Sequence, residues 1–65
     1  MTKLALFGAG GKMGVRLSKN LTKSDFNTVH VEVSPEGRAR LKAELGIECQ
    51  AADAALDGVD VVVLA

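Results

Sequence analysis

The spacing of apolar residues changes along the chain, and each change predicts a new element of secondary structure. Residues 3–7 are apolar after their first lysine, which is typical of a strand covered on both faces in a parallel sheet. Residues 12–23 then carry apolar side chains at every fourth position, which predicts one buried face of a helix. That face is expected to hold Met13, Leu17 and Leu21. Ser18 falls on the other side of this helix and is expected to face water.

The next segment alternates between apolar and polar residues, which predicts a strand over residues 28–33 with one buried face. That face is expected to hold Val29, Val31 and Val33. Ser34 as N-cap and Pro35 as first helical residue predict a second helix that extends to about residue 45. Its core-facing residues are expected to be Ala39, Leu41 and Leu45. Gly46 is suited to the left-handed conformation that ends many helices.

The last part of the chain predicts two further strands with a short helix between them. Residues 47–51 form the shorter predicted strand, and Asp53 is placed to cap one helical turn over residues 53–56. Residues 59–65 are almost continuously apolar, as expected of a strand at the centre of a sheet. Strands that alternate with helices in this way predict an α/β fold with a parallel sheet.

The turn between the first strand and the first helix contains four glycines, Gly8, Gly10, Gly11 and Gly14. The spacing G-x-G-x-x-G would require glycine where Met13 stands, whereas G-x-x-G-x-x-G fits Gly8, Gly11 and Gly14. Either spacing provides a tight turn, a backbone open to a pyrophosphate and a close helix–strand contact. A purely structural turn is the alternative. A phosphate loop of the G-x-x-x-x-G-K-[ST] type is excluded, because positions 6 and 13 hold Leu and Met.

The helix after this turn begins with amides that have no partner within the helix and can bind a phosphate. We therefore expect the pyrophosphate of a dinucleotide to bind at Gly8, Gly10, Gly11, Lys12, Met13 and Gly14. Lys12 and Met13 are expected to contribute their backbone amides, with the Lys12 ammonium group in water and the Met13 side chain in the core. A direct contact from the Lys12 ammonium group to a phosphate is the alternative.

Glu32 lies near the C-terminal end of the second predicted strand, 24 residues after Gly8 and 18 after Gly14. Dinucleotide-binding folds place a ribose-binding acid at about this distance. Its carboxylate can accept hydrogen bonds from both ribose hydroxyls and would repel a 2′-phosphate, so the sequence favours NAD over NADP. The alternative is a solvent-facing glutamate on an alternating strand. His30 is the single histidine and is expected to be a packing residue. The catalytic residues are unknown, because no nucleophile–base pair can be argued, and no metal site is expected.

Composition narrows the classes of function. The chain has 65 residues, 48% of them hydrophobic, with eight basic and eight acidic side chains, so no net field favours nucleic acid or an anionic membrane. No apolar run is long enough for a transmembrane helix or a signal peptide. The single cysteine, Cys49, fits a reducing, cytoplasmic setting. Because the chain is short for a dinucleotide-binding domain, we expect residues 1–65 to be the N-terminal part of one within a longer protein.

Three runs of the sequence, ALFGAGGKMG, VEVSPEGRARLKAELGI and DAALDGVDVVVLA, resemble the cofactor-binding region of the 6-phosphogluconate dehydrogenase-like superfamily. Within it, the resemblance is strongest to sugar-acid dehydrogenases that include the D-apionate oxidoisomerases. It implies a Rossmann-type doubly wound sheet with strand order 3-2-1-4, and a helical substrate domain beyond residue 65 through which the protein forms a homodimer. It also implies hydride transfer between NAD and a hydroxy or sugar acid, coupled to an isomerisation or acyl shift for an apionate-like substrate.

Three alternative functions stay open at this point. Dihydrodipicolinate reductases also use the G-x-x-G-x-x-G spacing, but they would carry a basic residue after the ribose acid, where this chain has Val33. A prephenate dehydrogenase-like enzyme is the second alternative. A non-catalytic module that senses the redox state of NAD is the third, and polar residues around the nicotinamide would discriminate it from an enzyme.

Overall fold

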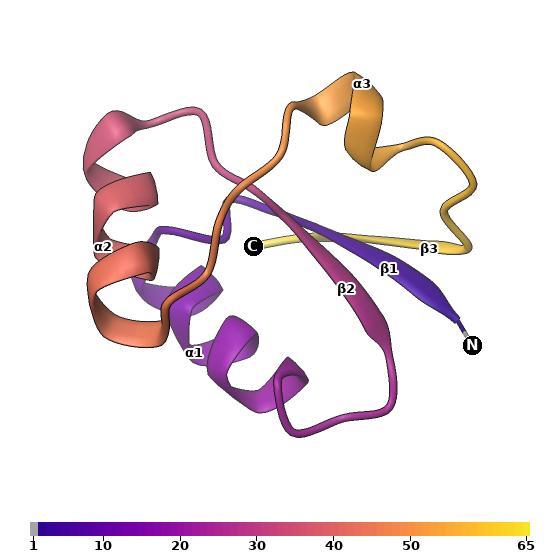
Figure 1. Ribbon diagram of the computed structural model, residues 1–65, viewed down its shortest axis with the longest axis horizontal. Helices are drawn as coiled ribbons and strands as arrows, with labels where there is room; N and C mark the ends of the chain where they lie inside the picture. Colours follow the sequence, from indigo (N-terminus) through magenta and orange to yellow (C-terminus); the bar gives the residue numbers. More distant parts are fainter. Residues whose placement is uncertain (1) are drawn as a thin grey trace.

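The computed structural model describes residues 2–65 as a parallel sheet with helices on both faces (Figure 1). The sheet has three strands in the order β2-β1-β3, and β1 pairs in parallel with both neighbours. The strands are β1 (Lys3–Phe7), β2 (Asn27–Val31) and β3 (Val61–Leu64). The helices are α1 (Lys12–Leu21), α2 (Pro35–Leu45) and α3 (Ala52–Ala55). The predicted α/β class and parallel sheet are therefore confirmed.

Each face of β1 packs into its own hydrophobic cluster, because successive side chains of a strand point to opposite faces of the sheet. Leu4 and Leu6 join Leu41 of α2 on one face, together with apolar residues of α1. Ala5 contacts a second cluster on the other face, which includes Ala55 of α3. Figure 1 shows the same arrangement, with α1 and α2 on one side of the sheet and α3 on the other. The apolar character of β1 thus reflects burial on both faces.

The two ends of α2 form as the sequence predicts. The Ser34 side chain accepts a hydrogen bond from the Gly37 amide at 3.2 Å, which satisfies one of the unpaired amides of the first turn. Pro35 stands at the first helical position, where its missing N–H has no consequence. Gly46 ends the helix with φ +67°, in the left-handed region that glycine adopts without strain.

The predicted strand over residues 47–51 does not form. This segment runs alongside β2 and donates one backbone hydrogen bond to it, from the Gln50 amide to the His30 carbonyl at 2.8 Å. Ile47 and Cys49 point inward and pack on the cluster beneath α2, so side-chain packing holds the segment without a continuous ladder. The predicted order 3-2-1-4 is therefore visible only in part, with β3 in the place expected for the fourth strand.

Several side chains point the other way from their predicted orientation. Met13 is 57% exposed and Ser18 is fully buried, because α1 turns Gly14 and Ser18 toward the sheet. Val33 is 85% exposed, since β2 ends at Val31 and the alternation stops there. Ala39 of α2 is exposed as well. The periodicity of the sequence predicts that one face of α1 is buried. The close contact of Gly14 with the glycine turn decides which residues lie on that face.

The short helix and last strand also differ in detail from the prediction. The N-cap of α3 is Ala51, and the Asp53 carboxylate instead accepts a hydrogen bond from the next amide, Ala54, at 3.0 Å. Within residues 2–65, β3 pairs with β1 alone and lies at an edge, not at the predicted centre. Its apolar side chains are accordingly exposed, to 79% for Leu64.

Candidate functional site

The glycine turn lies at the carboxyl ends of β1 and β2. Gly8 has φ +78°, a conformation that side chains disfavour, and this bend reverses the chain directly after β1. The amides of Gly8 and Ala9 both donate to the Val31 carbonyl, at 3.0 and 3.2 Å, which ties the turn to the end of β2. The Gly11 amide then donates to the Gly8 carbonyl at 3.2 Å and closes the turn. The turn is thus a compact, internally bonded unit.

Three of the four glycines are required by the fold itself. A Cβ atom on Gly10 would lie 2.5 Å from backbone atoms of Gly37, and one on Gly14 would overlap the Gly8 carbonyl. At Gly8 the positive φ is the constraint. A Cβ atom on Gly11, in contrast, would make only an ordinary contact, 3.6 Å from the Gly8 oxygen. No close contact among the described residues therefore requires glycine at position 11.

The first turn of α1 is open. Gly11 is its N-cap, with φ −75° and ψ 176°, and has no side chain with which to satisfy the amides that follow. The Gly11 carbonyl already accepts the Val15 amide at 2.8 Å, so the helix is formed from this residue onward. No acidic residue stands in the first turn, while the side chains of Lys12 and Met13 are exposed. An anion placed here would meet unpaired amides and the positive end of the helix dipole.

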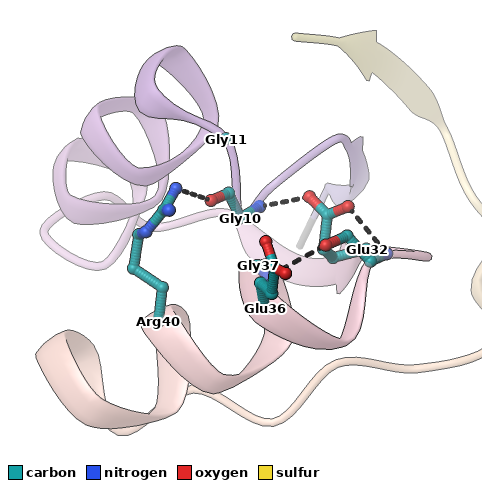
Figure 2. Close-up of a pocket in the computed structure, with 7 residues that line it drawn as sticks. Gly10, Gly11, Glu32, Glu36, Gly37 and Arg40 are labelled. Carbon is teal, nitrogen blue, oxygen red and sulfur yellow. Dashed lines mark hydrogen bonds between the residues drawn. The ribbon is translucent and has the colours of Figure 1, made fainter.

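Glu32 lies against the glycine turn, as Figure 2 shows. One carboxylate oxygen, Oε1, accepts a hydrogen bond from the Gly10 amide at 2.7 Å, and Oε2 accepts one from the Ser34 amide at 3.1 Å. A carboxylate has about four acceptor positions, so two remain for other donors. Gly37 leaves the space that the side chain occupies, since a Cβ atom there would lie 2.7 Å from Cγ of Glu32. The acid and the turn, predicted separately, are brought together.

A cavity of about 120 Å³ joins this carboxylate to the turn and the start of α2. It is lined by Gly10, Gly11, Glu32, Ser34, Glu36, Gly37 and Arg40. On one side of it, Nη1 of Arg40 donates to the Gly10 carbonyl at 2.8 Å (Figure 2). The sequence reasoning missed Glu36, Gly37 and Arg40 as part of the site. The available signal was Gly37, because glycine within the first turn of a helix disfavours the helix and so points to a close contact.

His30 belongs to the packing of the sheet and not to this site. It is paired with Leu6 in register, and only 7% of it is exposed. Burial lowers the pKa of its imidazole, because a charged ring would lose its hydration. Among residues 2–65, no partner reaches its Nε2 atom. The prediction of a packing histidine is consistent with this position.

Two further observations concern other classes of site. In the part of the chain that the structure describes, no three His, Cys, Asp or Glu side chains are grouped closely enough to hold a metal ion. None of the helices in residues 2–65 has the length and hydropathy needed to cross a bilayer.

Known proteins with similar sequences support the resemblance that the sequence suggests. The chain is 70% identical over 63 residues to a D-apionate oxidoisomerase of Cupriavidus necator, and 60% identical over 65 residues to one of Rhizobium rhizogenes. These alignments cover 97% and 100% of this chain, but only 23% and 24% of the two relatives. The chain thus spans about a quarter of the length of the curated relatives it matches.

A solved structure agrees with the fold. It is a crystal structure of a semialdehyde dehydrogenase NAD-binding protein from Cupriavidus necator in complex with calcium and NAD. It matches this chain with a TM-score of 0.97 and 68% identity, over 100% of this chain and 24% of the solved one. The fold is therefore of the Rossmann type. The family described as "NADP oxidoreductase coenzyme F420-dependent" matches residues 3–65, nearly the whole sequence, and the chain belongs to that family.

Proposed function

We propose that residues 1–65 are the N-terminal part of the dinucleotide-binding domain of an NAD-dependent oxidoreductase that acts on a hydroxy or sugar acid of the apionate type. Identities of 70% and 60% to D-apionate oxidoisomerases support this substrate class. The solved relative that is described as a complex with NAD supports the cofactor. Because the chain spans about a quarter of these proteins, the reaction of the whole protein is part of the proposal.

The observation that carries the proposal is the position of the Glu32 carboxylate, 2.7 Å from the Gly10 amide and beside the open first turn of α1. A dinucleotide presents an anionic pyrophosphate next to a neutral ribose, and these two groups need opposite partners. Unpaired amides suit the first, and a carboxylate with free acceptor positions suits the second. We assign the pyrophosphate to Gly8, Gly10, Gly11, Lys12, Met13 and Gly14, and the adenosine ribose to Glu32. The amides of Gly8, Gly10 and Gly11 already donate within the protein, so these glycines are assigned as the backbone that the pyrophosphate approaches and not as its donors.

The amides of Lys12 and Met13 are the expected phosphate donors, because both side chains point to solvent at the start of α1. The two hydrogen bonds that Glu32 already accepts hold its carboxylate in one orientation before a ligand arrives. A preorganised acceptor loses less conformational entropy on binding than a mobile one. When bound, the nicotinamide ring of NAD would supply the hydride acceptor, and its surroundings are not part of the geometry described above.

The choice between NAD and NADP depends on charge near the ribose. The family description names NADP, whereas the described complex of the solved relative contains NAD. In this chain Glu32 and Glu36 both line the cavity at the turn, and Arg40 donates to the Gly10 carbonyl. A 2′-phosphate at Glu32 would meet the negative charge of both carboxylates. Arg38 lines a second cavity with Glu32, but it lies within α2 and not directly after the acid, so we assign NAD as the cofactor.

Several features of the whole protein belong to the same proposal. A small-molecule substrate, a cytoplasmic location and a homodimer formed through a C-terminal helical domain are supported by the resemblance to sugar-acid dehydrogenases. The identity to D-apionate oxidoisomerases favours this group over dihydrodipicolinate reductases and prephenate dehydrogenases. A non-catalytic NAD-sensing module would bind NAD without reducing it in the presence of any hydroxy acid.

The test is a calorimetric titration of the full-length protein with NADH and with NADPH, followed by an assay of NAD reduction with D-apionate. We expect tighter binding of NADH, and a smaller preference in Glu32→Gln, because the amide removes the charge that repels a 2′-phosphate. Asp25→Asn is the matched control, since it removes one negative charge at the opposite end of β2. Equal or tighter binding of NADPH by the unmodified protein would contradict the role of Glu32. Tight NADH binding without turnover would favour the sensing module.

A further inference from the structure

We infer that Arg40 is a positioning residue that fixes the glycine turn from α2, so that dinucleotide binding at α1 depends on a side chain of the neighbouring helix. The inference rests on the proposed function for its effect on binding. Its structural part, the restraint of the turn, can be measured without any ligand.

Both hydrogen-bonding groups of Gly10 are held by charged side chains. Its amide donates to Oε1 of Glu32 at 2.7 Å, and its carbonyl accepts from Nη1 of Arg40 at 2.8 Å. Figure 2 shows these two side chains on opposite sides of the Gly10 backbone, one from the end of β2 and one from α2. Hydrogen bonds with a charged partner are roughly twice as strong as neutral ones. Gly10, which has no side chain, is thus held by hydrogen bonds on both sides of its backbone.

These two hydrogen bonds affect the start of α1 because the peptide unit is planar. The Gly10 carbonyl and the Gly11 amide belong to one plane and point in opposite directions. When Arg40 holds the carbonyl, the Gly11 amide is directed to the Gly8 carbonyl, which it reaches at 3.2 Å. Gly11 is the N-cap of α1, and its own carbonyl accepts the Val15 amide at 2.8 Å. The orientation of this one peptide therefore sets the direction in which the first amides of α1 face.

The turn needs such a restraint because glycine has more backbone freedom than any other residue. The two adjacent glycines, Gly10 and Gly11, have no side chains that could limit their conformations by packing. Contact between Gly10 and the backbone of Gly37 blocks displacement toward α2, but contact alone does not select a peptide orientation. A guanidinium group can do so, because its planar donors have a fixed geometry. Without Arg40, part of the binding free energy would be spent on ordering the turn.

The positive charge of Arg40 offers a second explanation for an effect of this residue on dinucleotide binding. Arg40 also lines an open cleft between α1 and α2 with Lys12 and Arg16, so it could attract an anionic ligand through charge alone. A charge effect would act at long range and would be screened by salt. It would not change the mobility of the turn in the absence of ligand. A hydrogen bond to the Gly10 carbonyl would change that mobility.

The experiment compares Arg40→Met with Lys42→Met in the full-length protein. Both variants remove one positive charge from an exposed position of α2, but the Lys42 side chain pairs with Glu48 on the surface and does not contact the turn. We expect Arg40→Met to raise the Kd for NADH about tenfold, equivalent to about 1.4 kcal/mol, with kcat at saturating NAD unchanged. We also expect faster hydrogen exchange at the Gly10 and Gly11 amides of the ligand-free variant. Lys42→Met should change neither quantity.

The possible outcomes distinguish the positioning role of Arg40 from the proposed function of the protein. Normal exchange at the turn in Arg40→Met, or an equal loss of NADH affinity in Lys42→Met, would overturn the positioning role. If the unmodified protein binds no NADH, the proposed function fails, and the exchange rates still decide whether Arg40 holds the turn. If Arg40→Met does not fold, nuclear magnetic resonance of the unmodified protein replaces it. Slow rotation of the Arg40 guanidinium group would support the restraint, and free rotation would contradict it.

Discussion

The two long helices begin next to each other at the same end of the sheet, but their first turns are completed in different ways. In α2, the Ser34 hydroxyl accepts the Gly37 amide at 3.2 Å, Pro35 removes one amide, and Glu36 adds a negative charge. In α1, the N-cap is Gly11, and the first turn contains neither a capping side chain nor an acid. Side chains of the protein thus satisfy the start of α2, whereas the start of α1 is left available to an anion.

This difference assigns separate tasks to the two helices. The closed helix α2 supports the site, since Gly37 and Arg40 contact Gly10 and the Ser34 amide holds Glu32. The open helix α1 is the one suited to a phosphate. A capped first turn stabilises α2 by about 1 kcal/mol, which favours its use as a support for its neighbours. The comparison therefore predicts that substitutions at the cap of α2 change stability first, whereas those at the open start of α1 change binding first.

The largest expected effect is that of Gly10→Ala, at the contact between the turn and α2. The added methyl group would lie 2.5 Å from the backbone of Gly37, so the two segments must move apart. We expect the free energy of unfolding to fall by about 1–3 kcal/mol, as for other overpacked sites. Denaturant unfolding of the full-length protein measures this, with NADH affinity as a second readout. Unchanged stability would show that the turn and α2 are not closely packed.

Gly11→Ala should lower the affinity for NADH more than it lowers the stability of the fold. Its methyl group would make only ordinary contacts within the protein, 3.6 Å from the nearest oxygen. Stability should therefore fall by no more than about 1 kcal/mol, the cost of alanine at an N-cap. If the pyrophosphate approaches the start of α1 closely, the same methyl group should lower NADH affinity about tenfold or more, at least about 1.4 kcal/mol. Calorimetry and a thermal melt of the same preparation provide both values. Retained affinity would place the pyrophosphate away from Gly11.

The smallest effect is expected for Ser34→Ala, which opens the first turn of α2. Loss of the capping hydroxyl should reduce stability by about 1 kcal/mol. NADH affinity should change little, because the Ser34 amide that holds Glu32 is retained. Stability is measured by denaturant unfolding and affinity by titration, as for the glycine variants. An affinity loss comparable to that of Gly11→Ala would mean that α2 also binds the phosphate, and the contrast between the helices would be wrong.

The sequence by itself determined the local elements of this protein. An unbroken apolar run predicted β1, a capping serine with proline predicted the start of α2, and Gly46 predicted its end. Those features depend on interactions between residues close in the chain, which are visible in the sequence. The glycine turn and Glu32 were also predicted as candidates, because their spacing follows from the order of strand, turn and helix.

Only the tertiary structure decided how these elements face one another. The periodicity of α1 was correct, but close approach of Gly14 to the turn rotated Met13 out and Ser18 in. Residues 47–51 alternate between apolar and polar side chains, yet they form no continuous ladder with β2. The bond from Arg40 to Gly10 joins residues 30 positions apart, at a distance that no local pattern encodes. Such contacts depend on the packing of whole elements, because each side chain is placed by neighbours that are distant in sequence and near in space.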